Sequence, residues 1–487
     1  MEAAGTLERG LTVLRALAAD PGRRTRATDL VRATGLARST VDRVLGTLVH
    51  LGHLRVEGRD VLLAPRLMEL GEAYLASGGL RDALDPLAER LAEELDESVS
   101  LAVRDGDGVR FIDQFTRRRT MSITFRVGDL LPADRCAAGL ALLDPAAPYA
   151  EDDQFVEPGL VAVAVPVRDE GGRAVCAVSV VSHTSRHTAA GLRDHCLPRL
   201  RETVREMEAA LAGRAARPDP PASAPDRRLR AAKREPGTGY LQSLARGLAV
   251  LVALGSTRGG LSLADCARAT GLPRASVRRA VQTLVRLGYA SADGTRFAPL
   301  PRVLELGYAH LSGRTFGEIV QPHLVDLVAR VRESASVAVL SGDDVVYVAR
   351  VPTVSIMSVD ISVGTRLPAY PTSLGRVLLA ELPEERLAAI VPRRLSRHTV
   401  TSAAELATAV RQAAVDGYAL VDQELEEGVR SIAVPVRDRT GRIAAAVNVA
   451  THASRATPAD LLRDVLPALT EAAARMEADL AYTRAAG

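Results

Sequence analysis

The chain has 487 residues, which is too long for a single hydrophobic core and predicts several domains. A hydrophobic content of 47% with 25% charged residues is ordinary for a soluble globular protein. The net charge of +3 is small for this length, so any nucleic-acid binding must come from local basic patches.

Two similar helical segments dominate the sequence: GLARSTVDRVLGTLVHL from Gly35 and GLPRASVRRAVQTLVRL from Gly271, 236 residues later. In both, apolar residues recur at i, i+3, i+4 and i+7 and therefore share one helix face. Each segment follows a short helix and an ATGL turn, which is typical of a helix-turn-helix that presents its second helix to a DNA major groove. Eight arginines lie between Arg23 and Arg59, and eight between Arg258 and Arg302. We therefore predict two DNA-recognition helices.

The repeat extends to both sides of these helices. TLERGLTVLRALAA near the N-terminus matches SLARGLAVLVALGS from Ser243, which predicts a first helix in each copy that covers the recognition helix. After each recognition helix, HLRVEGRDVLLAP or YASADGTRFAPLP alternates around a Glu-Gly or Asp-Gly turn and predicts a β-hairpin wing. Winged helix-turn-helix domains are thus predicted at residues 1–65 and 241–301, each followed by a short connector helix.

A larger α/β domain follows each winged domain. Predicted helices at Leu80 to Leu95 and Phe316 to Arg332 precede strands with a period of two, an antiparallel meander, a further strand pair and a final helix. The offset between copies rises from 236 to 269 before VAVAVPVRD, so the first copy lacks 33 residues, which read in the second as two helices and a strand. We predict an α+β multidomain chain with a truncated domain at residues 66–212, a flexible Pro/Arg-rich linker at 213–240 and a complete domain at 302–487.

This order of segments, ending in GYALVDQELEEGVRSIAVPVRD, resembles the IclR family of bacterial transcription regulators. The resemblance implies a tandem fusion of two units, each joining a winged helix-turn-helix to a GAF-like effector-binding domain. Gly417, Glu424, Ser431 and Ile432 fit the family signature, whereas Val421 occupies a position that the family fills with Asp or Ser. SVDISVGTRLPAYPTSLGRVLLAEL in the second copy is similar to the regulators of protocatechuate and 4-hydroxybenzoate catabolism, the PcaR, PcaU and PobR group.

The outward positions of the two recognition helices are the candidate DNA contacts. A helix N-terminus offers free N–H groups to phosphate, arginine can bind guanine through two hydrogen bonds, and glutamine can do so with adenine. The candidates are Arg38, Ser39, Thr40 and Arg43 in the first copy, and Arg274, Ser276, Arg278, Arg279 and Gln282 in the second. Because these sets differ, one chain would carry two unlike readers, suited to an asymmetric operator or to one strong and one weak half-site. The alternative is a solvated arginine-rich helix face.

The resemblance also implies an effector pocket in the second copy, between the sheet and the helix that starts near Pro371. The implied effector-binding residues are Thr372, Ser373, Leu374, Val421, Asp422, Ser431, Asn448 and Ala450. An apolar Val421 favours an aromatic or longer dicarboxylic acid over glyoxylate or pyruvate. The alternative is that Ser431 and Asn448 are ordinary strand residues with satisfied hydrogen bonds.

The first copy is expected to have lost this site. Its equivalent positions hold Cys136, Ala137, Ala138, Ala162 and Ser179, and the acidic strand is expected to be missing. This half would then be a structural partner, although it could instead bind something different.

Other chemistry has little support in the sequence. The four cysteines are far apart and form no CxxC pair, and no P-loop, GxGxxG or GxSxG stretch occurs in a suitable context, so no metal, cofactor or enzymatic activity is predicted. No apolar run approaches the roughly 18 residues of a membrane span, which favours a cytoplasmic protein. The expected partners are an operator DNA, a small organic acid and a second tandem chain. A metabolic enzyme with appended DNA-binding domains and a ligand-independent DNA-binding protein remain the alternatives.

Overall fold

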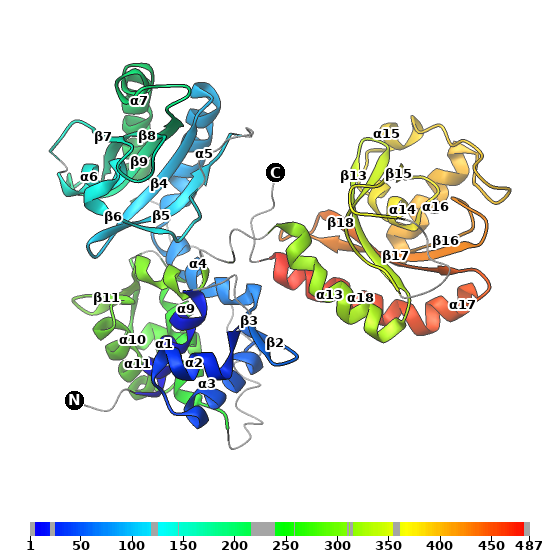
Figure 1. Ribbon diagram of the computed structural model, residues 1–487, viewed down its shortest axis with the longest axis horizontal. Coiled ribbons are helices and arrows are strands. Elements are labelled where there is room, and N and C mark those ends of the chain that lie inside the picture. The colour runs from blue at the N-terminus through cyan, green and yellow to red at the C-terminus, as the bar shows by residue number, and fades with distance from the viewer. Residues whose placement is uncertain are drawn as a thin grey trace. The chain divides into compact units, whose positions relative to one another are not determined.

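The computed structural model describes residues 5–19, 25–117, 125–144, 146–215, 239–257, 259–308, 311, 315–353 and 361–481. It divides into two compact units, Met1–Gly313 and Arg314–Gly487 (Figure 1). The predicted linker falls largely on residues 216–238, which lie outside the described residues, so its character stays a prediction. No helix in the described parts of the chain has the length and apolar content that crossing a membrane requires.

The first unit contains both predicted winged helix-turn-helix folds. The first is formed by α1 (Thr6–Ala18), β1 (Thr25–Arg26), α2 (Ala27–Thr34), α3 (Arg38–His50), β2 (Leu54–Glu57) and β3 (Asp60–Leu63). The second is formed by α9 (Gln242–Leu254), β10 (Leu261–Ser262), α10 (Leu263–Thr270), α11 (Arg274–Arg286), β11 (Ala290–Asp293) and β12 (Arg296–Pro299). Each has a three-stranded antiparallel sheet, in the order β1-β3-β2 or β10-β12-β11. The recognition helices and wings predicted from the sequence are therefore confirmed.

Local chemistry explains why each turn and recognition helix forms where it does. Gly35 and Gly271 end α2 and α10 with φ angles of 67° and 65°, a left-handed conformation that other residues adopt only with strain. The apolar face of each following helix is then buried, with Val41, Val44 and Leu48 at 0% exposure in α3. Burial of this face leaves the polar face of the same helix toward solvent.

Connector helices lead out of both winged folds. The first connector is a 3₁₀ turn at Pro65–Leu67 followed by α4 (Met68–Ser77). The second begins with η3 (Pro301–Leu306), a 3₁₀ helix, so a short helix is present where the connector was predicted. A proline opens both turns, and this suits the first helical position because a helix leaves that N–H without a partner.

The first α/β domain is a six-stranded antiparallel sheet in the order β6-β5-β4-β9-β8-β7. Its strands are β4 (Ser98–Asp105), β5 (Gly108–Phe115), β6 (Leu130–Pro132), β7 (Ala150–Asp153), β8 (Leu160–Arg168) and β9 (Ala174–His183). Its main helices are α5 (Leu80–Leu95), α6 (Ala137–Leu143) and α7 (Ala189–Ala215). Helices α5 and α7 contact each other and the sheet, and α6 contacts strands β7, β8 and β9.

The second α/β domain repeats this sheet in the order β15-β14-β13-β18-β17-β16. The strands are β13 (Ser334–Ser341), β14 (Asp344–Val351), β15 (Arg366–Pro368), β16 (Ala419–Asp422), β17 (Val429–Arg437) and β18 (Ile443–His452). The helices are α13 (Phe316–Val331), α14 (Ser373–Leu379), α15 (Glu384–Ala388), α16 (Ala403–Asp416), α17 (Pro458–Asp460) and α18 (Leu466–Leu480), with a π-helical turn at Leu461–Val465. One apolar core lies between the sheet and α13 with α18, and another lies between the opposite face and α14 with α16 (Figure 1).

The third strand of each predicted meander differs from expectation. The alternating runs MSITFRV (residues 121–127) and SIMSVDISV (residues 355–363) predict the third strand of each meander, whereas the structure pairs β6 with β5, and β15 with β14, a few residues later in the chain. Residues 121–124 and 355–360 of those predicted strands lie outside the described residues.

The 33-residue difference between the copies removes two helices and no strand. Six residues separate α6 from β7, whereas 39 separate α14 from β16, and those 39 include α15 and α16. The expected loss of the acidic strand is wrong, because β7 pairs with β8 in the same register as β16 with β17. Gln154 and Gln423, which follow these strands, both have a positive φ and both accept a hydrogen bond from the glycine five residues later. The first copy therefore keeps the whole sheet.

Candidate DNA interface and effector pocket

The predicted DNA-contact residues lie on the accessible face of their helices. Arg38, Ser39 and Arg43 in α3, and Arg274, Arg278, Arg279 and Gln282 in α11, are exposed, while Thr40 and Ser276 are half-buried. Neither helix has a side-chain N-cap, so the N–H groups of its first turn are not used by a capping side chain. Both N-termini can therefore offer N–H groups and helix dipole to a phosphate.

The two recognition helices differ in charge. In α3, Arg38 is held by Asp42, with its Nε atom 2.9 Å from the carboxylate. Arg278 occupies the position of Asp42 in α11, which contains four arginines and no acidic residue. The second helix therefore presents the stronger positive potential to DNA.

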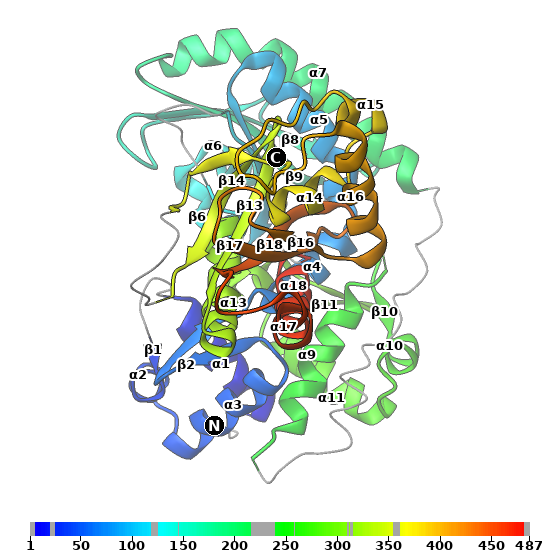
Figure 2. The same ribbon diagram turned by 90° about the vertical axis from the view of Figure 1, so that its right-hand side faces the viewer.

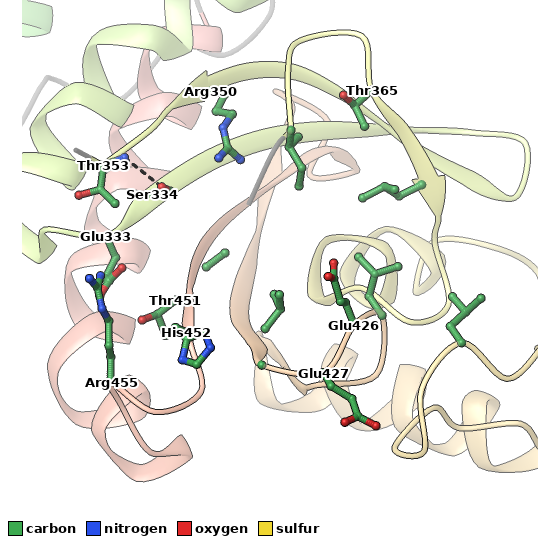
Figure 3. Close-up of a pocket in the computed structure, with 17 residues that line it drawn as sticks. Glu333, Ser334, Arg350, Thr353, Thr365, Glu426, Glu427, Thr451, His452 and Arg455 are labelled. Carbon is green, nitrogen blue, oxygen red and sulfur yellow. Dashed lines mark hydrogen bonds and ion pairs between the residues drawn. The ribbon is translucent and has the colours of Figure 1, made fainter. Parts of the chain in front are cut away.

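A pocket of 820 Å³ opens in the second α/β domain, which is a volume typical of small-molecule sites (Figure 3). Residues at the start of β13 and at the ends of β14 and β18 line one side of it. The loops that precede β15 and α16 and the loop that follows β16 line the other side. The lining residues are Glu333, Ser334, Arg350, Thr353, Ile361, Thr365, Leu367, Leu395, Leu425, Glu426, Glu427, Gly428, Val429, Ala450, Thr451, His452 and Arg455.

Charged and apolar side chains both line this pocket. Figure 3 shows the Arg350 side chain pointing from its strand into the space between the sheet and the loops. Glu333 and Arg455 form an ion pair at 3.6 Å, and Glu427 pairs with Arg397 at 3.5 Å. Those contacts partly neutralise the acidic residues of the rim, so an anionic group near Arg350 meets less repulsion.

The predicted effector residues mostly form the layer beneath this pocket. Of the eight, Ala450 lines the pocket, whereas Thr372, Ser373 and Leu374 at the start of α14 are buried. Ser373 Oγ donates to Ser431 Oγ at 2.8 Å, which ties the helix start to the sheet. Thr372 caps α14 by accepting a hydrogen bond from the backbone N–H of Gly375 at 2.9 Å. These polar groups are satisfied within the protein.

Asn448 differs from them. It is 5% exposed, and its Oδ1 atom has no hydrogen-bond partner among the described residues. It pairs with Ser336 across the β13–β18 ladder, one row behind Ser334 and Ala450, which line the pocket. A buried amide oxygen without a donor is costly, so this acceptor is available to a ligand that reaches the sheet.

Asp422 lies on the other face of the sheet. Side chains alternate along a strand, and Val421 is buried on the α14 and α16 side, as is Ala419. Asp422 instead accepts from Nε and Nη2 of Arg430 at 2.9 Å each, and Arg430 also donates to the carbonyl of Ala453. This ion pair lowers the pKa of Asp422 and braces the turn after β18.

A buried ion pair fastens two pocket loops. Arg376 Nη2 lies 2.7 Å from Glu424 Oε2, and both side chains are below 10% exposure. The Glu424 carbonyl accepts from Thr399 Oγ1 at 2.7 Å, and its carboxylate accepts from the backbone N–H of Val400 at 3.2 Å. Leu395 and Leu425, which line the pocket, neighbour this network in the chain. The pair thus positions the pocket wall without lining it.

The sequence interpretation missed the residues that reach into the pocket, chiefly Arg350, Thr353 and Thr451. Arg350 lies in the strand-like run VVYVARV, where a single arginine among apolar residues was the available signal. Which of these residues touch a ligand stays a prediction.

The first domain contains an unexpected acid at the signature position. Asp152 lies where the second copy has Val421, and it is 1% exposed. Its Oδ1 atom accepts from the Phe155 N–H at 2.8 Å, whereas Oδ2 has no hydrogen-bond partner among the described residues. Burial raises the pKa of this carboxyl.

Comparison with known proteins identifies these domains. A model of the IclR helix-turn-helix domain matches residues 6–58 and 243–294, and one described as bacterial transcriptional regulator IclR C-terminal matches residues 72–148, 146–209 and 309–478. The chain belongs to the IclR family. It contains the family's two domains twice and is a transcriptional regulator of that family.

Similar IclR proteins span about half of the chain. The Pca regulon regulatory protein of Pseudomonas putida is 42% identical over 277 residues, which are 56% of this chain and 92% of that protein. The p-hydroxybenzoate hydroxylase transcriptional activator of Acinetobacter baylyi is 35% identical, covering 48% of this chain and 90% of its own length. A transcriptional regulator of Rhodococcus sp. RHA1 with a crystal structure is 48% identical, with a TM-score of 0.45, and covers 50% of this chain and 98% of its own.

Proposed function

We propose that this IclR regulator binds an operator through α3 and α11 and that an aromatic carboxylic acid in the second-domain pocket changes its operator affinity. The pocket carries the proposal, because Arg350 can bind a carboxylate while Ile361, Leu367 and Leu395 surround a ring. The relatives named for pca and p-hydroxybenzoate hydroxylase regulation support the same chemical class.

The polar layer under the pocket fits a hydroxylated ring. An effector hydroxyl that reached Asn448 would donate to its Oδ1 atom and satisfy a buried acceptor. A carboxylate at Arg350 and a hydroxyl at Asn448 together would distinguish hydroxybenzoates from unsubstituted benzoate, because benzoate would leave the amide oxygen without a donor.

The chain then acts by binding rather than by turnover. Effector binding alters operator affinity only if the effector binds two arrangements of the protein with different affinities.

Calorimetric titration of the full chain with 4-hydroxybenzoate, protocatechuate and β-ketoadipate tests the ligand class. We expect saturable binding of the two aromatic acids and a loss of at least tenfold in Arg350→Met, whereas the control Arg366→Met, which changes an exposed β15 arginine bonded to Ser341, keeps the affinity. Binding of β-ketoadipate alone contradicts the aromatic class.

Operator titrations with and without the bound acid test regulation. Unchanged operator affinity in saturating ligand would favour a ligand-independent DNA-binding protein. Chromatographic detection of a product from the acid would favour an enzyme.

A further inference from the structure

The first helices of the two winged folds contact each other within one chain. Helix α1 lies against α9, as both views show (Figures 1 and 2). A Cβ atom placed on Gly247 would lie 2.5 Å from Leu7 Cδ1, and one on Gly10 would lie 2.3 Å from Leu244 Cδ1. Both glycines therefore provide the space that a leucine of the other helix fills.

These contacts are reciprocal. Leu7 and Leu244 are equivalent positions of the two copies, as are Gly10 and Gly247. Leucine of the first copy contacts glycine of the second, and leucine of the second contacts glycine of the first. Such reciprocal contacts between equivalent residues are characteristic of a twofold interface, which here forms between two parts of a single chain.

The connectors repeat the arrangement. A Cβ atom on Gly71 would meet the Tyr308 ring at 2.2 Å, and one on Gly307 would meet Leu67 Cδ2 at 2.9 Å. Gly71 and Gly307 are again equivalent positions. Equivalent glycines of the two connectors thus each pack against a side chain of the other connector, which leaves no room for larger side chains at these positions.

Residues at the local axis are unlike and complementary. Glu72 and Tyr308 are equivalent positions, and the Tyr308 hydroxyl donates to the Glu72 carboxylate. Arg81 Nη1 lies 3.6 Å from the same carboxylate. Equivalent residues meet only where a twofold axis passes, so a pair of identical first copies would place two glutamates against each other there.

The contacts at the edge of this interface are also asymmetric. Arg286 donates to Glu8 at 2.7 Å across the contact, whereas the equivalent positions on the opposite side hold His50 and Ala245. On that opposite side, Thr47 Oγ1 accepts from the Leu241 N–H at 3.0 Å instead. Each half therefore presents contacts that the other half complements and a copy of itself does not.

We propose that the two winged domains of one chain pair with each other, and that unlike residues at the pairing surface select this pair over pairing of like domains from two chains. One chain is then a complete two-reader unit and binds an asymmetric operator in a single orientation. The operator statement rests on the proposed DNA binding, whereas the pairing itself does not.

Disulfide trapping of the full chain tests pairing without DNA. The close approach of Leu7 and Gly247 suits a disulfide in Leu7→Cys/Gly247→Cys, and the four native cysteines are buried. We expect oxidation to give a single chain with an internal cross-link on a non-reducing gel, while Leu7→Cys alone gives none. A disulfide-linked dimer of chains, or two thiols that stay free, overturns the proposal. Gly10→Cys/Leu244→Cys repeats the test at the reciprocal contact.

Residue exchange tests the selection. Tyr308→Glu should lower the rate of internal cross-linking at least tenfold, because it replaces a charge-assisted hydrogen bond by two facing carboxylates. Glu72→Tyr/Tyr308→Glu should restore most of that rate, since it exchanges the two partners. An unchanged rate in the single variant, or no recovery in the double variant, refutes selection by this pair.

Footprinting on operator DNA distinguishes the proposed DNA binding from the proposed pairing within one chain. A footprint that loses one half-site in Arg43→Ala and the other in Arg279→Ala, with one internally cross-linked chain per duplex, supports both. An internal cross-link without operator binding contradicts the proposed function and leaves pairing intact. Restored binding in a co-expressed mixture of the two arginine variants shows pairing between chains and overturns the inference.

Discussion

Replacing Arg376 by leucine should destabilise the second domain and weaken its ligand pocket. Arg376 and Glu424 are 8% and 9% exposed and lie 2.7 Å apart, so the variant leaves a buried carboxylate without its cation. Loss of one partner of a buried pair costs about 3–5 kcal/mol. Glu424 keeps its hydrogen bond from the Val400 N–H, so we expect a cost near the lower end of this range. That cost is about 3 kcal/mol, or about a hundredfold in the folding equilibrium constant of the domain.

The first copy supplies the matched compensating variant. Its equivalent positions hold Leu140 and Phe155, so Arg376→Leu/Glu424→Phe removes both charges with side chains that this fold already contains. Since replacing both partners by apolar residues is often neutral, the double variant should cost about 1 kcal/mol or less. Arg437→Leu, at an exposed arginine of the same sheet, should change stability by about 0.5 kcal/mol at most.

Hydrogen exchange of the slowest amides in β17 and β18, measured by mass spectrometry, reports the stability of this domain. Calorimetric titration with 4-hydroxybenzoate reports the pocket. A single variant that loses less than about 1 kcal/mol, or a double variant as unstable as the single one, would refute the assignment of Arg376 and Glu424 as a buried charge pair that positions the pocket loops.

Three further outcomes are expected. Arg274→Ala should lower the salt dependence of operator binding by about one unit of slope, whereas the equivalent Arg38→Ala should lower it less, because Asp42 already neutralises that arginine; equal slopes would contradict the charge difference between the readers. Asp152→Asn should stabilise the first α/β domain at neutral pH, and hydrogen exchange of β7 and β8 should show the gain vanish in acid. The folded protein raises this pKa, so the contribution of this carboxyl to stability is fully present below its unfolded pKa of about 4 and is lost as pH rises through the folded pKa. Asn448→Leu should raise the melting temperature of the ligand-free protein, because it removes an unpartnered buried oxygen, yet lower hydroxybenzoate affinity; unchanged affinity would exclude Asn448 from the site.

The recognition helices could be predicted within a few residues because their signal is local. An apolar face with helical period, a glycine turn before it and a polar opposite face all agree in the same stretch. The duplication reinforced this signal, since two divergent sequences kept the same pattern.

Strand β7 was missed for an equally physical reason. Its residues Ala150–Asp153 are mostly acidic and show no apolar alternation, so local propensity argues against a strand. Pairing with β8 supplies the missing stabilisation, and that pairing depends on the tertiary structure and not on the local sequence. The face of Asp422 could have been deduced, because Val421 and Asp422 are neighbours in a strand and must point to opposite sides.

The leucines and glycines that form the reciprocal contacts could be read in the sequence. The sequence does not show which helix packs against Gly10 or Gly247. A small residue on an apolar helix face predicts close packing without naming the partner. The partner follows only when both copies are placed in one fold.

The local twofold pairing also bears on how such a chain can evolve. In a symmetric dimer every substitution at the axis occurs twice at once and must tolerate its own image. In this chain a change at position 308 occurs once and faces an unchanged Glu72, so each half can adapt to the other by single steps. Joining the copies thereby opens sequence changes at the axis that an assembly of identical subunits would eliminate by repulsion, and the same freedom lets the two readers diverge toward different DNA sequences.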